Sequence, residues 1–171
     1  MKIERKYIDL ERDRLLAQAM HLFGEGYDLK EGDVLPPFNF NVASRVLSSD
    51  FWEPDFIPVV AIDDVGEVIS VASYSNFDQM AGAAALDRLI THPQARRRGI
   101  GSRMLNYLAR QAKTDGRNEL RFIARSWDLV PYYERNGCKI GQFVTPLNKN
   151  PDMYLDVSGA KILEPQEAVS V

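Results

Sequence analysis

Cysteine and histidine are scarce in this chain of 171 residues, which contains one cysteine and two histidines. A single cysteine, Cys138, excludes an internal disulfide framework and indicates a reducing compartment. With His21 and His92 as the two histidines, a zinc site of the cysteine and histidine type is not expected. We expect Cys138 to be a small core residue and both histidines to be structural.

Long apolar runs are also missing, since none approaches the roughly 18 residues that a membrane-spanning helix needs. The first residues, MKIERKYIDLERD, carry charges throughout and are not expected to form a signal peptide. A net charge of −3 and a pI near 5.4 argue against a general nucleic-acid binder, which carries a basic excess. We therefore expect a cytoplasmic protein with no membrane and no nucleic-acid partner.

What the sequence does contain is an ordinary globular composition, with 45% apolar and 26% charged residues. The length fits one domain with a sizeable core, so residues 1–171 are expected to form a single domain. Repeats and low-complexity tracts are absent. Residues 158–171 are expected to be a loosely ordered tail.

The spacing of apolar residues predicts strands alternating with helices. We expect strands over residues 3–9, 57–62, 67–75, 84–91, 119–124, 139–145 and 153–157. We expect helices over residues 10–23, 41–49, 100–112 and 129–135. The strand–helix–strand unit from 84 to 124 has the length of a parallel crossover. The expected class is α/β or α+β, with a mixed, mostly antiparallel central sheet flanked by helices.

One stretch, HPQARRRGIGSRML at residues 92–105, combines arginines and glycines between a strand and a helix. The first N–H groups of a helix have no intrahelical partner, and the helix dipole favours an anion there. Gly99 and Gly101 would let phosphate oxygens approach the main chain, and Ser102 adds a hydroxyl. The stretch lacks the Gly-Lys-Ser/Thr of a Walker loop, and Met104 replaces the third small residue of a dinucleotide fingerprint. By itself the stretch predicts a phosphate site or a plain turn equally well.

Two blocks together resemble the GNAT superfamily of acyl-CoA-dependent N-acyltransferases. The family's Gln/Arg-x-x-Gly-x-Gly/Ala block, which follows a strand and a turn, is similar to RRRGIGS at 96–102 after LDRLITHPQA. The family's aromatic-Tyr-Glu-Lys/Arg-x-Gly-Phe block is similar to YYERNGC at 132–138. The resemblance is detailed over residues 84–141 and topological elsewhere. It implies the family fold, in which two strands splay apart into a V-shaped cleft.

The resemblance implies acetyl-CoA as co-substrate and no metal. The backbone N–H groups from Arg97 to Ser102 would hold the pyrophosphate, and the strand end would pair with the pantetheine amides. Solvated charge is an equally good interpretation of the Arg97 and Arg98 side chains. Ser126 stands where relatives carry a cofactor-contacting Asn, which puts that contact in question. The implied cofactor-binding residues are Leu89, Ile90, Thr91, Arg96, Arg97, Arg98, Gly99, Ile100, Gly101, Ser102 and Ser126.

Two residues are candidates for the chemistry. Tyr133 takes the position that in relatives protonates the departing thiolate, although a tyrosine packed on the sheet fits the same pattern. A free alkylamine has a pKa of about 10.4 and must lose a proton before it attacks. Asp87, on the strand before the glycine-rich stretch, is our candidate base, with Glu119 or a chain of waters as alternatives.

The acceptor site in this family is built from loops after the first helices. Those segments hold the acids Glu25, Asp28, Glu31, Asp33, Asp50, Glu53 and Asp55. They also hold the aromatic residues Phe38, Phe40, Phe51, Trp52 and Phe56. Acids favour a cationic amine, so a small-molecule amine or amino-acid derivative is the preferred acceptor. A protein or peptide acceptor, a longer acyl chain, and a non-catalytic CoA-binding sensor remain alternatives. Relatives are often homodimers, which is implied here as well.

Overall fold

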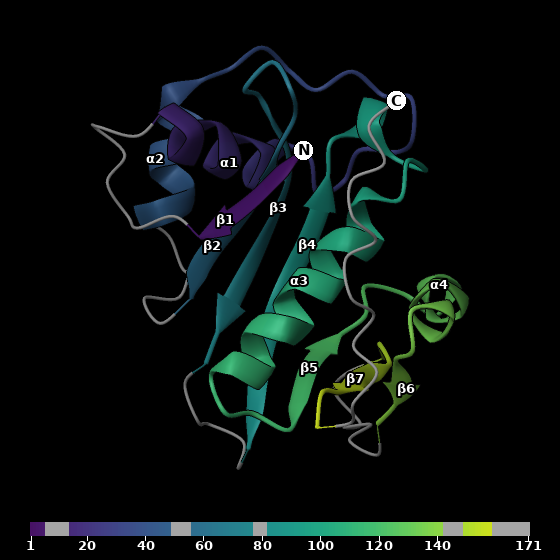
Figure 1. Ribbon diagram of the computed structural model, residues 1–171. Coiled ribbons are helices and arrows are strands. Elements are labelled where there is room, and N and C mark those ends of the chain that lie inside the picture. The colour runs from purple at the N-terminus through teal and green to yellow at the C-terminus, as the bar shows by residue number, and fades with distance from the viewer. Residues whose placement is uncertain (6–13, 49–55, 77–81, 142–148, 159–171) are drawn as a thin grey trace. The chain divides into compact units, whose positions relative to one another are not determined.

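The computed structural model describes residues 1–5, 14–48, 56–76, 82–141 and 149–158 (Figure 1). The described strands are β1 (Lys2–Arg5), β2 (Ile57–Ile62), β3 (Val68–Ser75), β4 (Ala83–Thr91), β5 (Glu119–Ile123), β6 (Lys139–Ile140) and β7 (Asp152–Asp156). The described helices are α1 (Arg14–Glu25), α2 (Phe40–Ser48), α3 (Ile100–Thr114) and α4 (Val130–Arg135). Short 3-10 turns at Pro93–Ala95 and Trp127–Leu129 precede α3 and α4.

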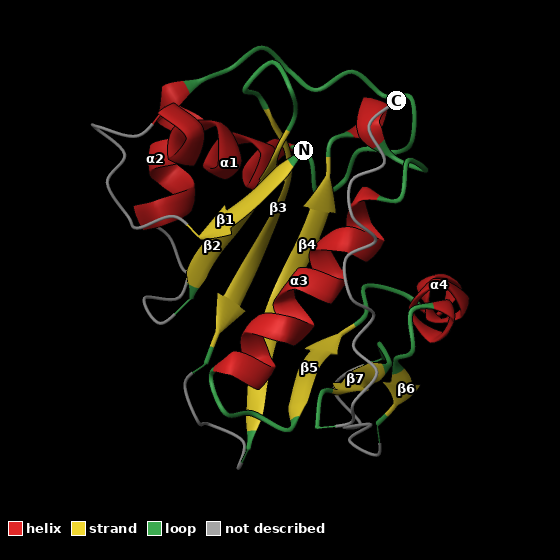
Figure 2. Ribbon diagram, viewed as in Figure 1, coloured by secondary structure: helices red, strands yellow, loops and turns green. Residues whose placement is uncertain are grey.

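The strands form a mixed sheet in the order β1-β2-β3-β4-β5-β7-β6. The pairs β1–β2, β2–β3, β5–β7 and β6–β7 are antiparallel. The β4–β5 pair is parallel, with Ala83–Ala85 opposite Glu119–Arg121, and α3 connects these two strands (Figure 2). The expected class, a mixed and mostly antiparallel sheet with flanking helices, is therefore confirmed.

The chain divides into two compact units. The first unit comprises Met1–Ser75 and Leu86–Met104, and the second comprises Asn76–Ala85 and Leu105–Val171. Strand β4 and helix α3 each contribute residues to both units. The expectation of a single domain over 1–171 stays a prediction, and most of the expected tail lies outside the described residues.

In the first unit, the apolar face of α1 packs on β2 and β3, and α2 packs on α1. The β-branched run of β2 is buried at almost every position, as expected for a strand covered by other elements. The buried cluster consists of Leu16, Ala19, Met20, Leu22, Phe23, Ala43, Val46, Val60, Ile62, Val68, Val71 and Ile90. Full burial of each large side chain stabilises the fold by about 1.5–3 kcal/mol. This core includes Ile90 near the C-terminal end of β4 and Phe23 near the end of α1, and both elements lead to the candidate site.

Helix α1 differs from its sequence prediction at its C-terminus. We expected the helix to end at residue 23, stopped by Gly24 and Gly26, but α1 includes Gly24 and continues to Glu25. A Cβ on Gly24 would lie 2.8 Å from Val46 Cγ2 of α2, so the glycine permits close helix–helix packing. The helix ends instead before Gly26, whose N–H donates to Leu22 O at 2.8 Å. Residues 6–13, where the first strand and this helix were expected to meet, lie outside the described residues.

The second unit contains the remainder of α3, strands β5 to β7 and α4. Helix α3 ends at Thr114, and Gly116 follows it with a φ of +75°, while the N–H of Arg117 donates to Ala112 O at 2.9 Å. The core side chains of this unit are Leu105, Leu108, Ala109, Ala112, Leu120, Phe122, Tyr133, Cys138, Met153 and Val157. Strand β6 was expected over 139–145, but β6 covers Lys139–Ile140, and residues 142–148 lie outside the described residues.

Candidate active site

The segment between β4 and α3 turns sharply at two residues. The His92 Nδ1 accepts a hydrogen bond from the Gln94 N–H at 3.3 Å, which starts the turn at Pro93–Ala95. Farther along, φ is +59° at Arg97 and +74° at Gly99, while φ of Arg98 between them is not positive. Alternating backbone handedness of this kind directs successive N–H groups into a concavity and is typical of anion-binding loops.

Helix α3 begins directly after this turn with free N–H groups. Its first hydrogen bond runs from the Arg103 N–H to Gly99 O at 3.1 Å. The N–H groups of Ile100, Gly101 and Ser102 therefore precede the helical ladder, at the positive end of the helix dipole. A Cβ on Gly99 would meet nothing within 4 Å, so space is open beside the backbone there. The residues of the expected pyrophosphate site thus form the arrangement that binds anions at helix N-termini.

The three arginines before α3 have different surroundings. Arg98 is exposed. Arg97 is also exposed, and its Nε lies 2.5 Å from Glu31 Oε2. The Arg96 guanidinium is half-buried and donates to Thr91 O at 3.0 Å, Leu29 O at 2.6 Å and Gly26 O at 3.4 Å. Its side chain therefore fixes the main chain around the site.

The end of β4 is held by side-chain hydrogen bonds. The Ser70 hydroxyl donates to Ile90 O at 2.8 Å, and Thr91 O accepts from Arg96. A carbonyl oxygen has two lone pairs, so each of these carbonyls retains capacity for a second donor. Ile90 is buried, whereas Leu89 and Thr91 are half-buried. The strand end therefore has a fixed main chain with acceptors that a ligand amide could use.

The candidate base Asp87 has a cationic neighbour that the sequence analysis did not identify. Asp87 is exposed, and its Oδ2 lies 3.5 Å from the Nε of Arg88. The Arg88 guanidinium carbon lies 5.0 Å from the Phe23 ring centroid and 4.7 Å from that of Tyr27, within the range of cation–π attraction. The signal in the sequence was a pair of aromatic residues four positions apart, Phe23 on α1 and Tyr27 just after it. The aromatic contacts hold Arg88 beside the carboxylate.

The alternative base Glu119 lies at the start of β5 in the second unit. Its Oε2 accepts from the Arg121 Nε at 2.8 Å, and Arg121 NH1 lies 3.8 Å from Asp152 Oδ2. Arg121 also lies over the Tyr154 ring, 5.6 Å from its centroid. Glu119 is thus part of a half-buried ion-pair network. Asp87 is more exposed and its ion pair is longer, so it is better suited to exchange a proton with water.

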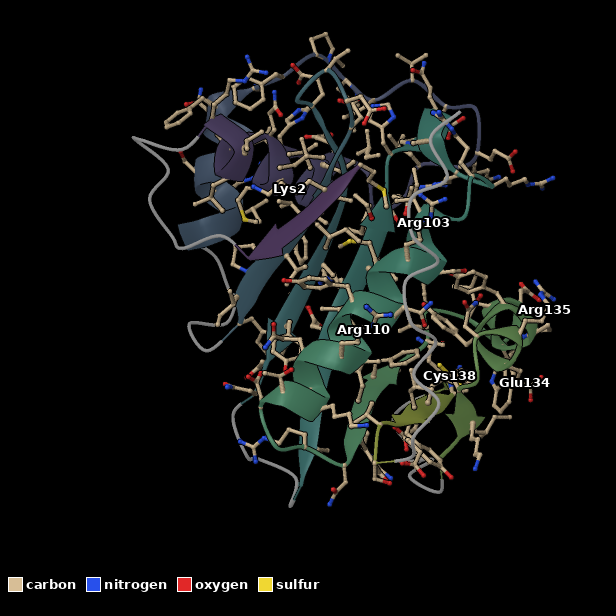
Figure 3. All side chains as sticks on the ribbon, in the orientation of Figure 1. Lys2, Arg103, Arg110, Glu134, Arg135 and Cys138 are labelled. Atoms are coloured by element: carbon tan, nitrogen blue, oxygen red, sulfur yellow. The ribbon has the colours of Figure 1, made fainter. Side chains whose placement is uncertain are left out.

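Tyr133 is buried in α4 of the second unit. Its ring lies 4.6 Å from the Phe122 ring centroid and 5.1 Å from that of Tyr132, which meets it edge-on. The next residues, Glu134 and Arg135, are exposed and point away from the helix (Figure 3). The buried, aromatic surroundings fix the direction of the Tyr133 side chain. They agree with both interpretations of this residue, as a proton donor and as a packed ring.

Ser126 occupies the N-cap position of the turn at Trp127–Leu129, but its side chain makes no capping hydrogen bond. Its carbonyl accepts from the Leu129 N–H at 3.2 Å, and the Trp127 Nε1 donates to Lys149 O at 2.9 Å. The turn is therefore held by backbone and indole groups.

Both histidines have depressed basicity. Burial lowers the pKa of His21, and the negative charge of Glu25 opposes that effect. The His21 ring lies 5.4 Å from the Phe38 ring, and within the described residues its Nε2 has no hydrogen-bond partner. Burial and then the positive charge of Arg96 lower the pKa of His92. Both side chains are thus neutral at neutral pH.

Four of the seven acids expected near the acceptor lie within the described residues. Glu31 pairs with Arg97, and Asp33 Oδ2 accepts from the Lys30 N–H at 2.6 Å. Phe38 and Phe40 are exposed, whereas Phe56 packs against the core of the first unit. The five remaining members of the two sets, Asp50, Phe51, Trp52, Glu53 and Asp55, lie outside the described residues.

Cys138 is buried, as expected, and burial raises the pKa of its thiol to about 12. The thiol therefore remains protonated at pH 8, whereas an unfolded cysteine with a pKa of about 8.5 is partly thiolate. We expect iodoacetamide at pH 8 to alkylate the native protein about 1,000-fold more slowly than the urea-unfolded protein. Mass spectrometry of timed samples measures both rates. Equal rates would show that Cys138 is accessible and reactive.

Within the described residues, no helix combines the length and apolarity needed to cross a bilayer. The same part of the chain contains no group of three or more His, Cys, Asp or Glu side chains positioned to hold a metal ion.

The mixed sheet with its flanking helices and the glycine-containing turn before α3 are those of a class of acyltransferases. A model of the acetyltransferase (GNAT) family matches residues 27–138, which include β4, the turn and Tyr133. The chain therefore belongs to this family and is an acyltransferase.

The individual proteins that this chain resembles have low sequence identity to it or match only part of it. The tRNA(Met) cytidine acetyltransferase TmcA of Aeropyrum pernix is 32% identical over 87 residues, covering 46% of this chain and 12% of that protein. The structure of Tetrahymena GCN5 has a TM-score of 0.66 at 13% identity, over 92% of this chain and 96% of that one. An aminoglycoside 6'-N-acetyltransferase in complex with coenzyme A has a TM-score of 0.65 at 19% identity, over 94% and 99% of the two chains. At these identities, the structural likenesses establish the fold.

Proposed function

We propose that the protein is an N-acetyltransferase that moves an acetyl group from acetyl-CoA directly to a primary amine of a small molecule or amino-acid derivative. The observation that carries this proposal is the turn at Arg97–Gly99, which leads into three unpaired N–H groups at the start of α3. A di-anionic pyrophosphate fits such a site by charge and by hydrogen-bonding capacity. A GNAT structure solved with coenzyme A supports the choice of cofactor.

The N–H groups from Arg97 to Ser102 would hold the pyrophosphate, with Arg98 and Arg97 adding charge. The strand end at Leu89, Ile90 and Thr91 would accept hydrogen bonds from the pantetheine amides, as an added strand does. Arg96 would contribute by fixing the carbonyls around this site. Ser126 would offer its hydroxyl to the cofactor.

In the proposed reaction, the neutral amine nitrogen attacks the thioester carbonyl carbon, so that a C–N bond forms and the C–S bond breaks. Asp87 would take the proton of the incoming ammonium through water, which its exposure permits. The Tyr133 hydroxyl would donate a proton to the departing thiolate. The products are an N-acetylated acceptor and the free thiol of coenzyme A.

The acids after α1 support a cationic acceptor. Glu25, Asp28, Glu31 and Asp33 lie within ten residues of one another, and the last three are exposed. A cluster of exposed carboxylates attracts cations and disfavours anions at moderate ionic strength. The aminoglycoside acetyltransferase of similar fold acts, by its name, on a polyamino compound, which agrees with this preference.

A free-thiol release assay with acetyl-CoA tests the function. The panel should contain polyamines, aminoglycosides, amino-acid amides and peptides with free N-termini, with acetyl-CoA and longer acyl-CoA donors run in parallel. We expect turnover with at least one small amine and acetyl-CoA. Turnover restricted to peptides, or to longer donors, would contradict the stated acceptor or donor. Binding of CoA without turnover on the whole panel would favour the non-catalytic sensor.

A further inference from the structure

Three arginines of the first unit contact the short segment Gly26–Glu31, which follows α1. Arg88 lies over the Tyr27 ring, Arg96 donates to Gly26 O and Leu29 O, and Arg97 pairs with Glu31. The segment therefore lies against the turn that the proposed function assigns to the cofactor. The three contacts differ in burial and in the kind of partner. These differences indicate which arginine can exchange its partner for a bound anion.

The Arg96 side chain is half-buried and bonds to the main chain. Its half-buried guanidinium donates to three main-chain carbonyls, one from each nitrogen, so the side chain is already engaged with the protein before an anion binds. The segment must also lie close to the core at this point. A Cβ on Gly26 would lie 2.6 Å from Leu22 O and 3.2 Å from Ile90 Cγ2. Gly26 and Arg96 together hold the start of the segment in place.

The Arg97 contact, in contrast, is an ion pair between two exposed side chains. The Arg97 side chain is 82% exposed and that of Glu31 is 49% exposed, and a single Nε–Oε2 contact of 2.5 Å joins them. Exposed ion pairs contribute little because water and salt screen them. A phosphate group offers several oxygens and more negative charge than one carboxylate, and guanidinium binds it in a bidentate manner.

We propose that Glu31 is an internal competitor for the cofactor: its carboxylate occupies Arg97 in the free protein, and the pyrophosphate of coenzyme A displaces it. This inference rests on the proposed function, since it takes the turn at Arg97–Gly99 as the pyrophosphate site. Glu31 thereby sets the cofactor affinity below the value that Arg97 alone would give. Cofactor entry also releases the Glu31 carboxylate in the segment where we propose that the cationic acceptor binds.

Calorimetric titration with coenzyme A at low ionic strength tests the competition. Glu31→Gln keeps the size of the side chain and removes its charge, so it should lower the dissociation constant by about three-fold. Arg97→Ala should raise that constant by about five-fold. The double variant is decisive, because Glu31→Gln should bring no gain when Arg97 is absent. Asp33→Asn is the matched control, since it removes a nearby charge, retains an acceptor for the Lys30 N–H and should change the affinity less than Glu31→Gln.

The results that would overturn the proposal can be told apart. An unchanged affinity in Glu31→Gln shows that the ion pair does not compete with the cofactor. A gain that persists in the Arg97→Ala background, or that Asp33→Asn reproduces, shows general repulsion between the acids and the anion. Wild-type protein that binds no coenzyme A overturns the proposed function, whereas the first two results leave that function intact. Adding salt should shrink the gain from Glu31→Gln, because screening weakens the pair.

Discussion

Replacing Gly101 by glutamate is expected to abolish binding of acetyl-CoA, with a loss in affinity of at least about 100-fold, or about 2.7 kcal/mol. Gly101 is the second residue of α3, and its N–H is one of the three that precede the helical ladder. A glutamate there would place a negative charge and a bulky side chain beside the proposed pyrophosphate. Calorimetric titration with coenzyme A measures the loss.

The same substitution should leave the fold intact, which makes it a clean test. An acid in the first turn of a helix interacts favourably with the dipole, and glutamate has a higher helix propensity than glycine. We therefore expect the melting temperature of Gly101→Glu to equal or exceed that of the wild type. Gly101→Ala is the matched control, since it adds one methyl group without charge and should keep most of the affinity. Normal affinity in Gly101→Glu would remove the start of α3 from the cofactor site.

The elements around this site were predictable because they depend on local patterns. Strand β4 was expected over 84–91 and is observed at Ala83–Thr91, and the start of α3 at Ile100 agrees with the prediction. Apolar periodicity and the glycines of the turn carry that information within about 20 residues. The predicted end of α1 at residue 23 was two residues short, although the helix does end before Gly26. Gly24 lies inside the helix and packs closely against Val46 of α2, a contact that the periodicity of α1 does not contain.

The contacts of the arginines could not be predicted for the same reason. The motif drew attention to Arg96 and Arg97 as cations near a phosphate. Their partners, Leu29 and Glu31, lie more than 60 residues earlier in the chain, and the separation of the Arg96–Leu29 pair is 67 residues. Whether an arginine meets a carbonyl, a carboxylate or solvent depends on how the segment after α1 returns to β4. The sequence thus predicted the backbone of the candidate site better than the roles of its side chains.

Tyr133→Phe is expected to lower kcat by about 100-fold, a typical contribution of one general acid. The substitution removes one hydroxyl and keeps the ring that packs on Phe122, so the fold and the affinity for coenzyme A should change little. The proposed role concerns the departing thiolate, which exists only as the C–S bond breaks. The loss should therefore appear in kcat, with the KM for acetyl-CoA within about two-fold of the wild type.

The neighbouring ring provides the control for Tyr133. Tyr132 is half-buried and meets Tyr133 edge-on, so Tyr132→Phe removes a hydroxyl from the same helix and the same aromatic contact. Because residues adjacent on a helix do not face the same direction, Tyr132→Phe should retain wild-type turnover. Equal losses in the two variants would indicate that the pair stabilises α4 and takes no part in proton transfer. Full activity in Tyr133→Phe would assign protonation of the thiolate to water, and Tyr133 would then be a packing residue.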